Sequence, residues 1–227
     1  APSIQYKKSF RSPHLFPTLA VLDAELTLPL SRQQTAYSGM DAITQLIESF
    51  ITKNASPLTD ALALAGLRLA LPAMRRLITD LHDLEAREHL LLASTLSGIT
   101  LANAGLGMAH GFAPAFGALY GVPHGMACAI LLPHAMRFNQ PAAEAKFAAI
   151  GALVDPAETH PPRLAQAAIA AIQEINDTFQ IPRDFQEFQI PQNEKPAILD
   201  RSRGNSMNGN PIPVRDDEAL AFLEKIL

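Results

Sequence analysis

The feature that most constrains the fold is the stretch of residues 84–104, which is apolar on almost every side of a helix. Asp83 stands directly before it and can cap its first turn with a side-chain oxygen. A helix that is apolar nearly all round predicts a buried position, so we expect this helix near the centre of a helical protein. Gly105 and Gly107 follow, and they predict a sharp turn after which the chain presents His110.

Two histidines after this turn are candidate metal ligands. His110 and His124 lie fourteen residues apart, and each is followed by a glycine. Neutral imidazole is the commonest metal ligand in proteins, and a glycine beside it lets backbone or substrate come close because it has no Cβ. A histidine in an apolar helix is also often a hydrogen-bonded core residue. Two histidines alone therefore do not decide between these interpretations.

A third candidate ligand lies far upstream, in the segment GMDAITQLIESF. Ile43, Ile47 and Phe50 recur at steps of three and four, which predicts an amphipathic helix. Asp41 and Gln45 are four residues apart and share one face of that helix. Because an unpaired buried charge is costly, Asp41 is expected either to be paired or to bind a metal.

Together, Asp41, His110 and His124 offer one oxygen and two nitrogen donors. This mixed set suits a divalent transition metal such as iron or zinc, with positions left open for a substrate. The competing interpretation is three unrelated polar residues satisfied by hydrogen bonds. Only a metal centre requires the three donor atoms to converge on one point.

Three blocks of the sequence carry a resemblance to a known family: GMDAITQLIESF, SPLTDAL and GLGMAHGFAPAFGALYGVPHGMACAILLPHAMRFN. In this order and spacing they resemble the C-terminal, metal-binding half of the iron-containing alcohol dehydrogenases. The resemblance runs from about Lys7 to the end and is densest over residues 38–139. It implies an all-α, multi-helix bundle, the C-terminal domain of the dehydroquinate synthase-like fold, preceded by a short extended segment.

Members of this family typically bind their metal through one aspartate and three histidines. By resemblance, Asp41, His110 and His124 are three of these ligands. Gln45 stands where the family has its other metal-binding histidine, and we expect it at the edge of the site, as a weak carbonyl ligand or beside a water. Pro114 stands where a further family histidine is often implicated in proton transfer. Related enzymes such as glycerol dehydrogenase manage with three protein ligands, so the resemblance still implies bound Fe²⁺ or Zn²⁺. It gives no catalytic residue beyond the metal site.

The resemblance also implies a nicotinamide cofactor and a domain that binds it. The family places a dinucleotide-binding domain before this region, and we expect that domain to lie outside this chain. We find no GxGxxG and no comparable glycine-rich phosphate-binding run, so the residues that bind NAD(P) are left unassigned. We expect residues 1–30 to be an extended segment from the edge of the cofactor domain, with a short strand over Leu19–Asp23. Residues 31–227 are expected to form the helical metal-binding domain.

The remaining helices are predicted from caps, prolines and apolar spacing. Pro72 is expected to kink or break the helix that contains it, and His134 is interpreted as a structural, hydrogen-bonded residue. The expected segments are a short turn capped by Ser31 and a helix over 38–52, a helix begun by Ser56 and Pro57, a helix from His124 to Arg137, alanine-rich helices over 142–154 and 161–179, a short helix near 194–203, a loop over 204–211 and a helix over 216–226 capped by Asp216.

Composition argues against several classes of function. The chain has 227 residues, of which 48% are hydrophobic, enough for a sizeable core. Its net charge of −4, without a charge run, gives no reason to expect a nucleic-acid or membrane-surface partner. The apolar runs end before the length of a membrane span, and the first ten residues lack the apolar core of a signal peptide. The one cysteine, Cys128, excludes an internal disulfide and is interpreted as a buried, small apolar residue. The cytoplasm is the expected compartment.

The first functional hypothesis is an oxidoreductase: the catalytic, metal-binding half of an NAD(P)-dependent alcohol dehydrogenase. Such an enzyme interconverts small alcohols and aldehydes by hydride transfer, and this chain alone is expected to be inactive without a site for the nicotinamide. One alternative is a maleylacetate reductase-like enzyme of the same family. Another, favoured by Gln45 and Pro114, is a catalytically inactive helical fragment that serves assembly or metal binding. Expected partners are an alcohol or aldehyde, the missing dinucleotide-binding domain, and further copies of the chain in a homo-oligomer.

Overall fold

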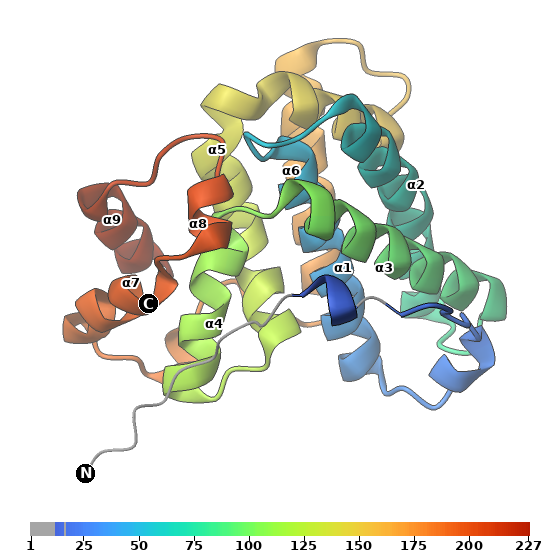
Figure 1. Ribbon diagram of the computed structural model, residues 1–227, viewed down its shortest axis with the longest axis horizontal. Helices are drawn as coiled ribbons and strands as arrows, with labels where there is room; N and C mark the ends of the chain where they lie inside the picture. Colours follow the sequence, from blue (N-terminus) through green and yellow to red (C-terminus); the bar gives the residue numbers. More distant parts are fainter. Residues whose placement is uncertain (1–11, 16) are drawn as a thin grey trace.

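The computed structural model describes residues 12–15 and 17–227, and this part of the chain is all-α, as predicted (Figure 1). Strands are absent from these residues. The helices are α1 (Arg32–Ile51), α2 (Pro57–Thr79), α3 (Leu84–Ala104), α4 (Met108–Tyr120), α5 (His124–Val154), α6 (Pro161–Thr178), α7 (Lys195–Ser202), α8 (Asn205–Gly209) and α9 (Asp216–Ile226), with 3₁₀ helices η1 (Pro13–Leu15), η2 (Ala24–Thr27), η3 (Gln186–Phe188) and η4 (Gln192–Glu194).

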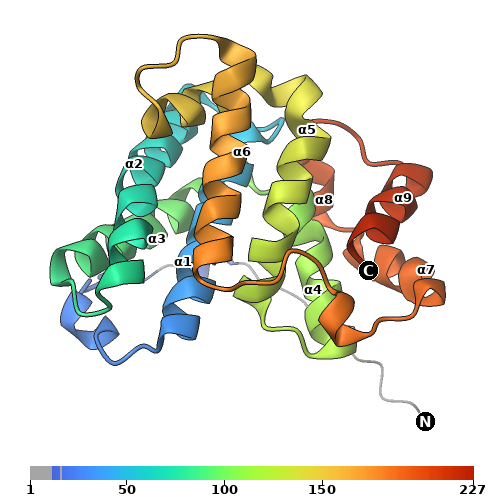
Figure 2. The same cartoon turned by 180° about the vertical axis from the view of Figure 1, so that it is seen from behind.

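The helices form one bundle in which α1 and α5 link two groups. On one side α1 packs against α2 and α3, and on the other side α4 packs against α7 and α8. The long helix α5 contacts α1 and α4, and α6 runs along α5 on the face shown in Figure 2. The metal-ligand candidates are carried on α1, α4 and α5, so they lie where the two groups of helices meet.

The prediction that residues 84–104 lie at the centre is wrong. The predicted helix forms as α3, capped by the Asp83 side chain, but it packs on α1 and α2 along one side only. Leu92 and Ile99 on its other side are each 43% exposed. The central position belongs to α5, whose residues 126–132 are all buried. The sequence of a helix that is apolar on all sides does not tell which of its side chains other helices of the same chain will bury.

The predicted strand over Leu19–Asp23 is also wrong. These residues form neither helix nor strand, and the side chains of Leu19 and Val21 are 78% and 81% exposed. A strand needs a neighbouring strand to satisfy its backbone, and the described residues supply none. Part of the expected extended segment, residues 1–11 and 16, lies outside the described residues.

Helix α1 begins earlier than predicted. Ser31 caps the whole helix: its Oγ accepts from the Gln34 backbone N–H, and the Gln34 side chain accepts from the Ser31 N–H in return. No proline or glycine interrupts residues 32–38, so the expected short turn is the first part of α1. Ser56 and Pro57 start α2 as predicted. Pro72 does not break α2, which continues to Thr79. Pro72 and Arg68 are both exposed, so the Arg68 carbonyl that loses its N–H partner lies on the solvent side of the helix.

The two helices predicted over 124–137 and 142–154 are both present within α5, where they follow one another without a loop. Helix α5 bends at Ala143, just after Pro141, where the backbone leaves helical geometry (φ −123°, ψ 17°). The second alanine-rich helix is confirmed as α6. Gly151 permits close packing of these helices, because a Cβ there would lie 1.9 Å from the carbonyl oxygen of Leu164.

The C-terminal third covers α4. Helix α7 is confirmed, but the loop expected over 204–211 contains the short helix α8. The last helix has the predicted bounds, although its N-cap is Arg215 instead of Asp216. The Glu218 carboxylate accepts a hydrogen bond from the Arg215 backbone N–H, so a side chain of α9 itself provides a partner for the N–H group before its first turn. Aromatic rings join these elements to α4, with Phe112 stacked on Phe222 at 5.3 Å.

The turn between α3 and α4 changes the direction of the chain sharply, so that α4 packs inside the bundle. Gly105 has φ 77°, a left-handed conformation that favours glycine. The two helices meet at a bend of 105°. Within the described residues no single helix has the length and apolarity to cross a membrane, whereas α3 and α4 taken together reach both by length and composition.

Candidate metal centre

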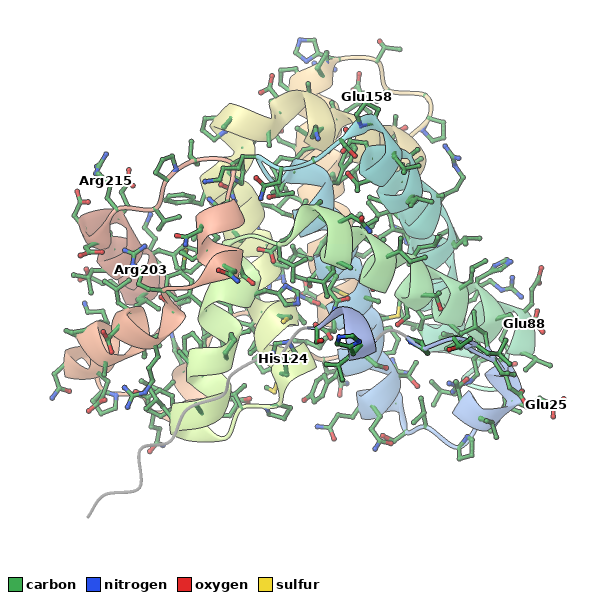
Figure 3. The ribbon with its side chains drawn as sticks, viewed as in Figure 1. Glu25, Glu88, His124, Glu158, Arg203 and Arg215 are labelled. Carbon is green, nitrogen blue, oxygen red and sulfur yellow. The ribbon has the colours of Figure 1, made fainter. Side chains whose placement is uncertain are left out.

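Four side chains from three helices bring potential metal-binding atoms together. Asp41 comes from the middle of α1, His110 from the first turn of α4, and His124 and Cys128 from the first two turns of α5. One donor atom from each lies within 4.8 Å of all the others. In Figure 3, His124 lies toward the middle of the molecule, whereas the labelled charged side chains lie around its edge.

The distances between these atoms suit a shared metal ion. His110 Nε2 lies 3.1 Å from Asp41 Oδ1, and His124 Nε2 lies 3.6 Å from the same oxygen. Cys128 Sγ lies 3.6 Å from each of the two Nε2 atoms. A tetrahedral ion with bonds of about 2.0–2.3 Å separates its ligands by roughly 3.3–3.8 Å. The three distances of 3.6 Å lie in this range and the shortest lies just below it, so the donor set fits a divalent metal in chemistry and comes close to it in spacing.

Glu48 holds His110 in place. This carboxylate is 1% exposed and accepts hydrogen bonds from the backbone N–H groups of Ala109 and His110 at 2.6 and 3.2 Å. It also lies 2.8 Å from His110 Nδ1. A carboxylate accepting from the outer nitrogen fixes the tautomer of a metal-binding histidine. With Nδ1–H donated to Glu48, the lone pair of Nε2 faces Asp41, and only a proton or a cation makes that contact favourable.

Electrostatics around the imidazole of His110 favour a positive charge. Burial opposes that charge, but Cys128, Asp41 and Glu48 together outweigh burial and hold the pKa of His110 well above its usual value. Burial likewise raises the pKa of Asp41, yet the hydrogen bond and charge of His110, with the charge of His124, bring it below its usual value. Burial raises the pKa of the Cys128 thiol to about 11. The cluster thus attracts a proton or a metal cation.

Gln45 lies at the edge of the cluster, but its carbonyl oxygen is turned away from it. That oxygen accepts from the Ser97 hydroxyl at 2.8 Å, and the Gln45 amide NH₂ donates to Asp41 Oδ2 at 3.2 Å. In this arrangement Gln45 orients the carboxylate of Asp41. Pro114, one turn after His110 in α4, has no group that can transfer a proton.

Sequence reasoning missed Glu48 and the position of the Cys128 sulfur. Glu48 lies seven residues after Asp41, so it stands two turns further along the same face of α1. Cys128 is buried, as predicted, but it lies one turn after His124 and so points its sulfur at the same place. Helical spacing from a known candidate was the available signal in both cases. His134 is structural, as predicted, since its Nε2 lies 2.9 Å from the carbonyl oxygen of Arg183.

Close backbone packing fixes the position of His110. A Cβ on Gly107, just before α4, would lie 2.8 Å from Glu48 Oε1 and 3.0 Å from Asn210 Oδ1. Asn210 accepts the Met108 N–H at 3.2 Å and pairs through its amide with Asn139. The first turn of α4 is therefore held from α1 and from the C-terminal third at once.

A cavity of about 350 Å³ leads to the cluster from outside. The side chains of Asp41 and His124 are 25% and 30% exposed, whereas that of His110 is almost fully buried. The cavity is lined by Leu30, Gln34, Tyr37, Ser38, Asp41, His124 and Gly125. A small molecule can therefore approach the side of the cluster formed by Asp41 and His124.

The fold and this cluster define an all-α domain with a candidate metal-binding site, and comparison with known sequences gives a family of metal-dependent enzymes. The chain matches the model of the Fe-containing alcohol dehydrogenase family, C-terminal, over residues 35–227. This chain belongs to that family.

Individual relatives agree with this assignment. The chain is 34% identical to 1,3-propanediol dehydrogenase of Klebsiella pneumoniae over 213 residues, covering 92% of this chain and 55% of that protein. It is 33% identical to lactaldehyde reductase of Escherichia coli K12, covering 88% of this chain and 52% of that protein. The chain thus spans about half the length of the relatives it matches.

Solved structures resemble this fold closely. A crystal structure of 1,3-propanediol oxidoreductase superposes with a TM-score of 0.86 at 33% identity, over 90% of this chain and 55% of that one. Maleylacetate reductase from Rhizobium sp. strain MTP-10005 superposes with a TM-score of 0.82 at 24% identity, over 96% and 59% of the two chains. The second likeness is one of fold.

Proposed function

We propose that this chain is the metal-binding half of an NAD(P)-dependent oxidoreductase that interconverts alcohols and aldehydes by hydride transfer. Asp41, His110 and His124 hold Fe²⁺ or Zn²⁺. The observation that carries the proposal is the convergence of these three donors beside a cavity. Membership of the Fe-containing alcohol dehydrogenase family supports the reaction class.

The residues have separate roles in this proposal. A bound divalent metal supplies Lewis acidity toward the oxygen of the alcohol or aldehyde. Asp41 supplies negative charge, Glu48 keeps Nε2 of His110 facing the site, and the cavity beside His124 admits a small substrate. The nicotinamide is bound by a domain outside this chain, and the span of about half the relatives' length agrees with that. The cytoplasm is the proposed compartment, in keeping with a single cysteine that cannot form an internal disulfide.

Metal binding is the first test. Chain stripped of metal by a chelator is titrated with Zn²⁺ or, without oxygen, with Fe²⁺, and binding is followed by calorimetry and elemental analysis. We expect one metal per chain, and we expect His110→Ala and Asp41→Asn to abolish or greatly weaken binding. His82→Ala, which removes an exposed histidine, is the matched control and should bind like the parent chain. Equal binding by the parent and His110→Ala would reject the site.

Substrate access is the second test, and it separates an enzyme from an inactive metal-binding fragment. Co²⁺ replaces the bound metal, and its visible absorption is recorded while a short diol or aldehyde is added. A change that saturates with concentration is expected if the substrate oxygen reaches the metal. An unchanged spectrum would favour the inactive fragment. The maleylacetate reductase alternative has no specific support beyond a shared fold.

A further inference from the structure

We propose that Cys128 is the fourth protein ligand of this centre, which makes it an aspartate, two-histidine and cysteine site suited to zinc. The inference rests on the proposed function, because it concerns the same metal. It departs from the aspartate and three histidines that the resemblance implied. The carrying observation is that Cys128 Sγ lies 3.6 Å from both His110 Nε2 and His124 Nε2.

The position of the Cys128 sulfur follows from the geometry of α5 and from how α5 packs on α1 and α4. His124 and Cys128 are four residues apart at the start of α5, so their side chains stack on one face one turn apart. That face is directed at α1, which carries Asp41, and at the first turn of α4, which carries His110. All four donors therefore come from rigid helices whose relative positions are set by the core.

Gln45 does not compete for the fourth position. Its carbonyl oxygen lies 2.8 Å from the Ser97 hydroxyl, which also lies 2.7 Å from the Ser94 carbonyl oxygen, and its NH₂ group faces Asp41. Without a metal, reversing the amide would place its oxygen against the Asp41 carboxylate, where two acceptors repel each other. An NH₂ group has no lone pair to offer a metal, so in this orientation Gln45 is not a ligand.

Cys128 is buried, but its sulfur does not lie among apolar side chains alone, as a cysteine that only fills the core would. The S–H group also has Asp41 as a hydrogen-bond partner, so the sulfur contacts three polar side chains at once. One metal ion contacts the sulfur and both nitrogens together. A coordinating thiol is deprotonated, and a thiolate with Asp41 then balances the two charges of the ion.

The sulfur also indicates which metal the site prefers. Thiolate is a soft ligand, and tetrahedral sites of mixed sulfur and nitrogen ligands are typical of zinc. A substrate oxygen would then bind as a fifth ligand, a coordination number that zinc can reach. An aspartate and histidines alone would suit iron equally well. We therefore expect the chain to keep zinc when both metals are offered at equal concentration without oxygen.

X-ray absorption at the zinc edge tests the inference on the whole chain. We expect one sulfur neighbour at about 2.3 Å and nitrogen or oxygen neighbours at about 2.0–2.2 Å. Because Cys128 is the only cysteine, the sulfur signal has one thiolate source. In Cys128→Ser the sulfur neighbour should disappear. Circular dichroism of the metal-free variants checks that each is folded.

A rescue variant distinguishes a lost ligand from a damaged fold. Cys128→Ser combined with Gln45→His replaces the sulfur with a nitrogen donor from the facing helix, and it should bind zinc through nitrogen and oxygen only. If the parent chain binds zinc with no sulfur neighbour, the inference is overturned and the proposed metal site stands. If the parent chain binds no zinc or iron at all, the inference and the proposed site both fail.

Discussion

The donor atoms of this centre are held by neighbours that do not themselves bind the metal. Glu48 fixes the ring of His110, and Gln45 fixes the carboxylate of Asp41. Both neighbours come from α1 and lie within two turns of Asp41. The orientation of the site therefore depends on one helix more than on the loops around it.

Replacing Glu48 by glutamine tests this dependence. Glutamine keeps the size of the side chain but removes the charge, and its amide can present an N–H where His110 needs an acceptor. Loss of such an outer partner typically costs about 10–100-fold in metal affinity, and we expect a loss in this range for Zn²⁺ by chelator competition. Glu88→Gln, at an exposed position on α3, is the control and should change nothing. Unchanged affinity in Glu48→Gln would show that His110 is held by packing alone.

At the residue scale the sequence pointed to three of the four clustered side chains. Asp41, His110 and His124 stood out because histidines beside glycines and an acid on an amphipathic helix are unusual patterns. Cys128 did not, because a cysteine in an apolar helix has the same pattern whether its sulfur faces a core or a metal site. Only the relative rotation of α1, α4 and α5 decides between the two, and that rotation is set by long-range packing.

The helices pack closely enough that single glycines control the distance between them. The contact of α5 with α6 depends on Gly151, where any side chain would overlap the backbone of Leu164. The exposed Gly98 in α3 has open space where its Cβ would be. The same substitution should therefore have opposite effects at the two sites.

Alanine at each glycine tests the packing. Gly151→Ala should destabilise the fold by about 1–3 kcal/mol or more, because α5 and α6 must separate. Gly98→Ala should stabilise it by about 0.5–1 kcal/mol, since glycine is a poor helix former. Urea unfolding followed by circular dichroism measures both. A neutral Gly151→Ala would mean that the two helices can shift without cost.

His134 on α5 should make stability depend on pH. Burial lowers its pKa below the usual value, and this outweighs the hydrogen bond to the carbonyl of Arg183. Below about pH 6.5 the unfolded chain then binds more protons than the folded one, so the free energy of unfolding falls as the pH falls. The neighbouring charges are Arg137 and Lys225, which act in the same direction as burial, and Asp184, which opposes it.

The measurement compares the parent chain with His134→Gln, which keeps a side-chain donor but does not titrate. Urea midpoints between about pH 8 and pH 5 should fall less steeply in the variant. Every other titratable group is common to both proteins, so the difference in slope reports His134. Parallel curves would indicate that the ring is as easily protonated in the fold as outside it.

The starts of α2 and α3 followed local signals in the sequence, whereas the positions of the helices in the bundle did not. Ser56 with Pro57, and Asp83, start their helices where the sequence predicts, because capping is a contact between near neighbours in the chain. The placement of α3 at the centre failed, because the exposure of Leu92 and Ile99 depends on which surfaces meet. The helix α8 was missed because its five residues are held by α4 and not by their own propensity.

At the scale of the molecule, many of the large exposed apolar side chains among the described residues belong to α3 and to the segment before α1. Leu19, Val21 and Leu26 are each more than three-quarters exposed, and Leu92 and Ile99 are 43% exposed. Exposed apolar side chains on a folded protein often lie in contacts when several of them are close together. Self-association is therefore expected for this chain.

Sedimentation velocity over a range of concentrations measures that association. We expect a dimer or larger species for the parent chain, and a shift toward monomer when Leu92 and Ile99 are both replaced by lysine. Leu58→Lys, which changes an exposed leucine on α2, is the control. A monomer at every concentration would contradict the prediction.

The spread of the donors along the chain has a consequence for the lifetime of the folded state. Sixty-nine residues separate Asp41 from His110, so their side chains meet only after α1 has docked on α4 and α5. A complete set of ligands for a metal therefore exists only once these helices have docked. Interactions that are absent from the folding transition state slow unfolding and leave the folding rate almost unchanged. The bound metal would then slow unfolding, and its removal would shorten the lifetime of the folded state.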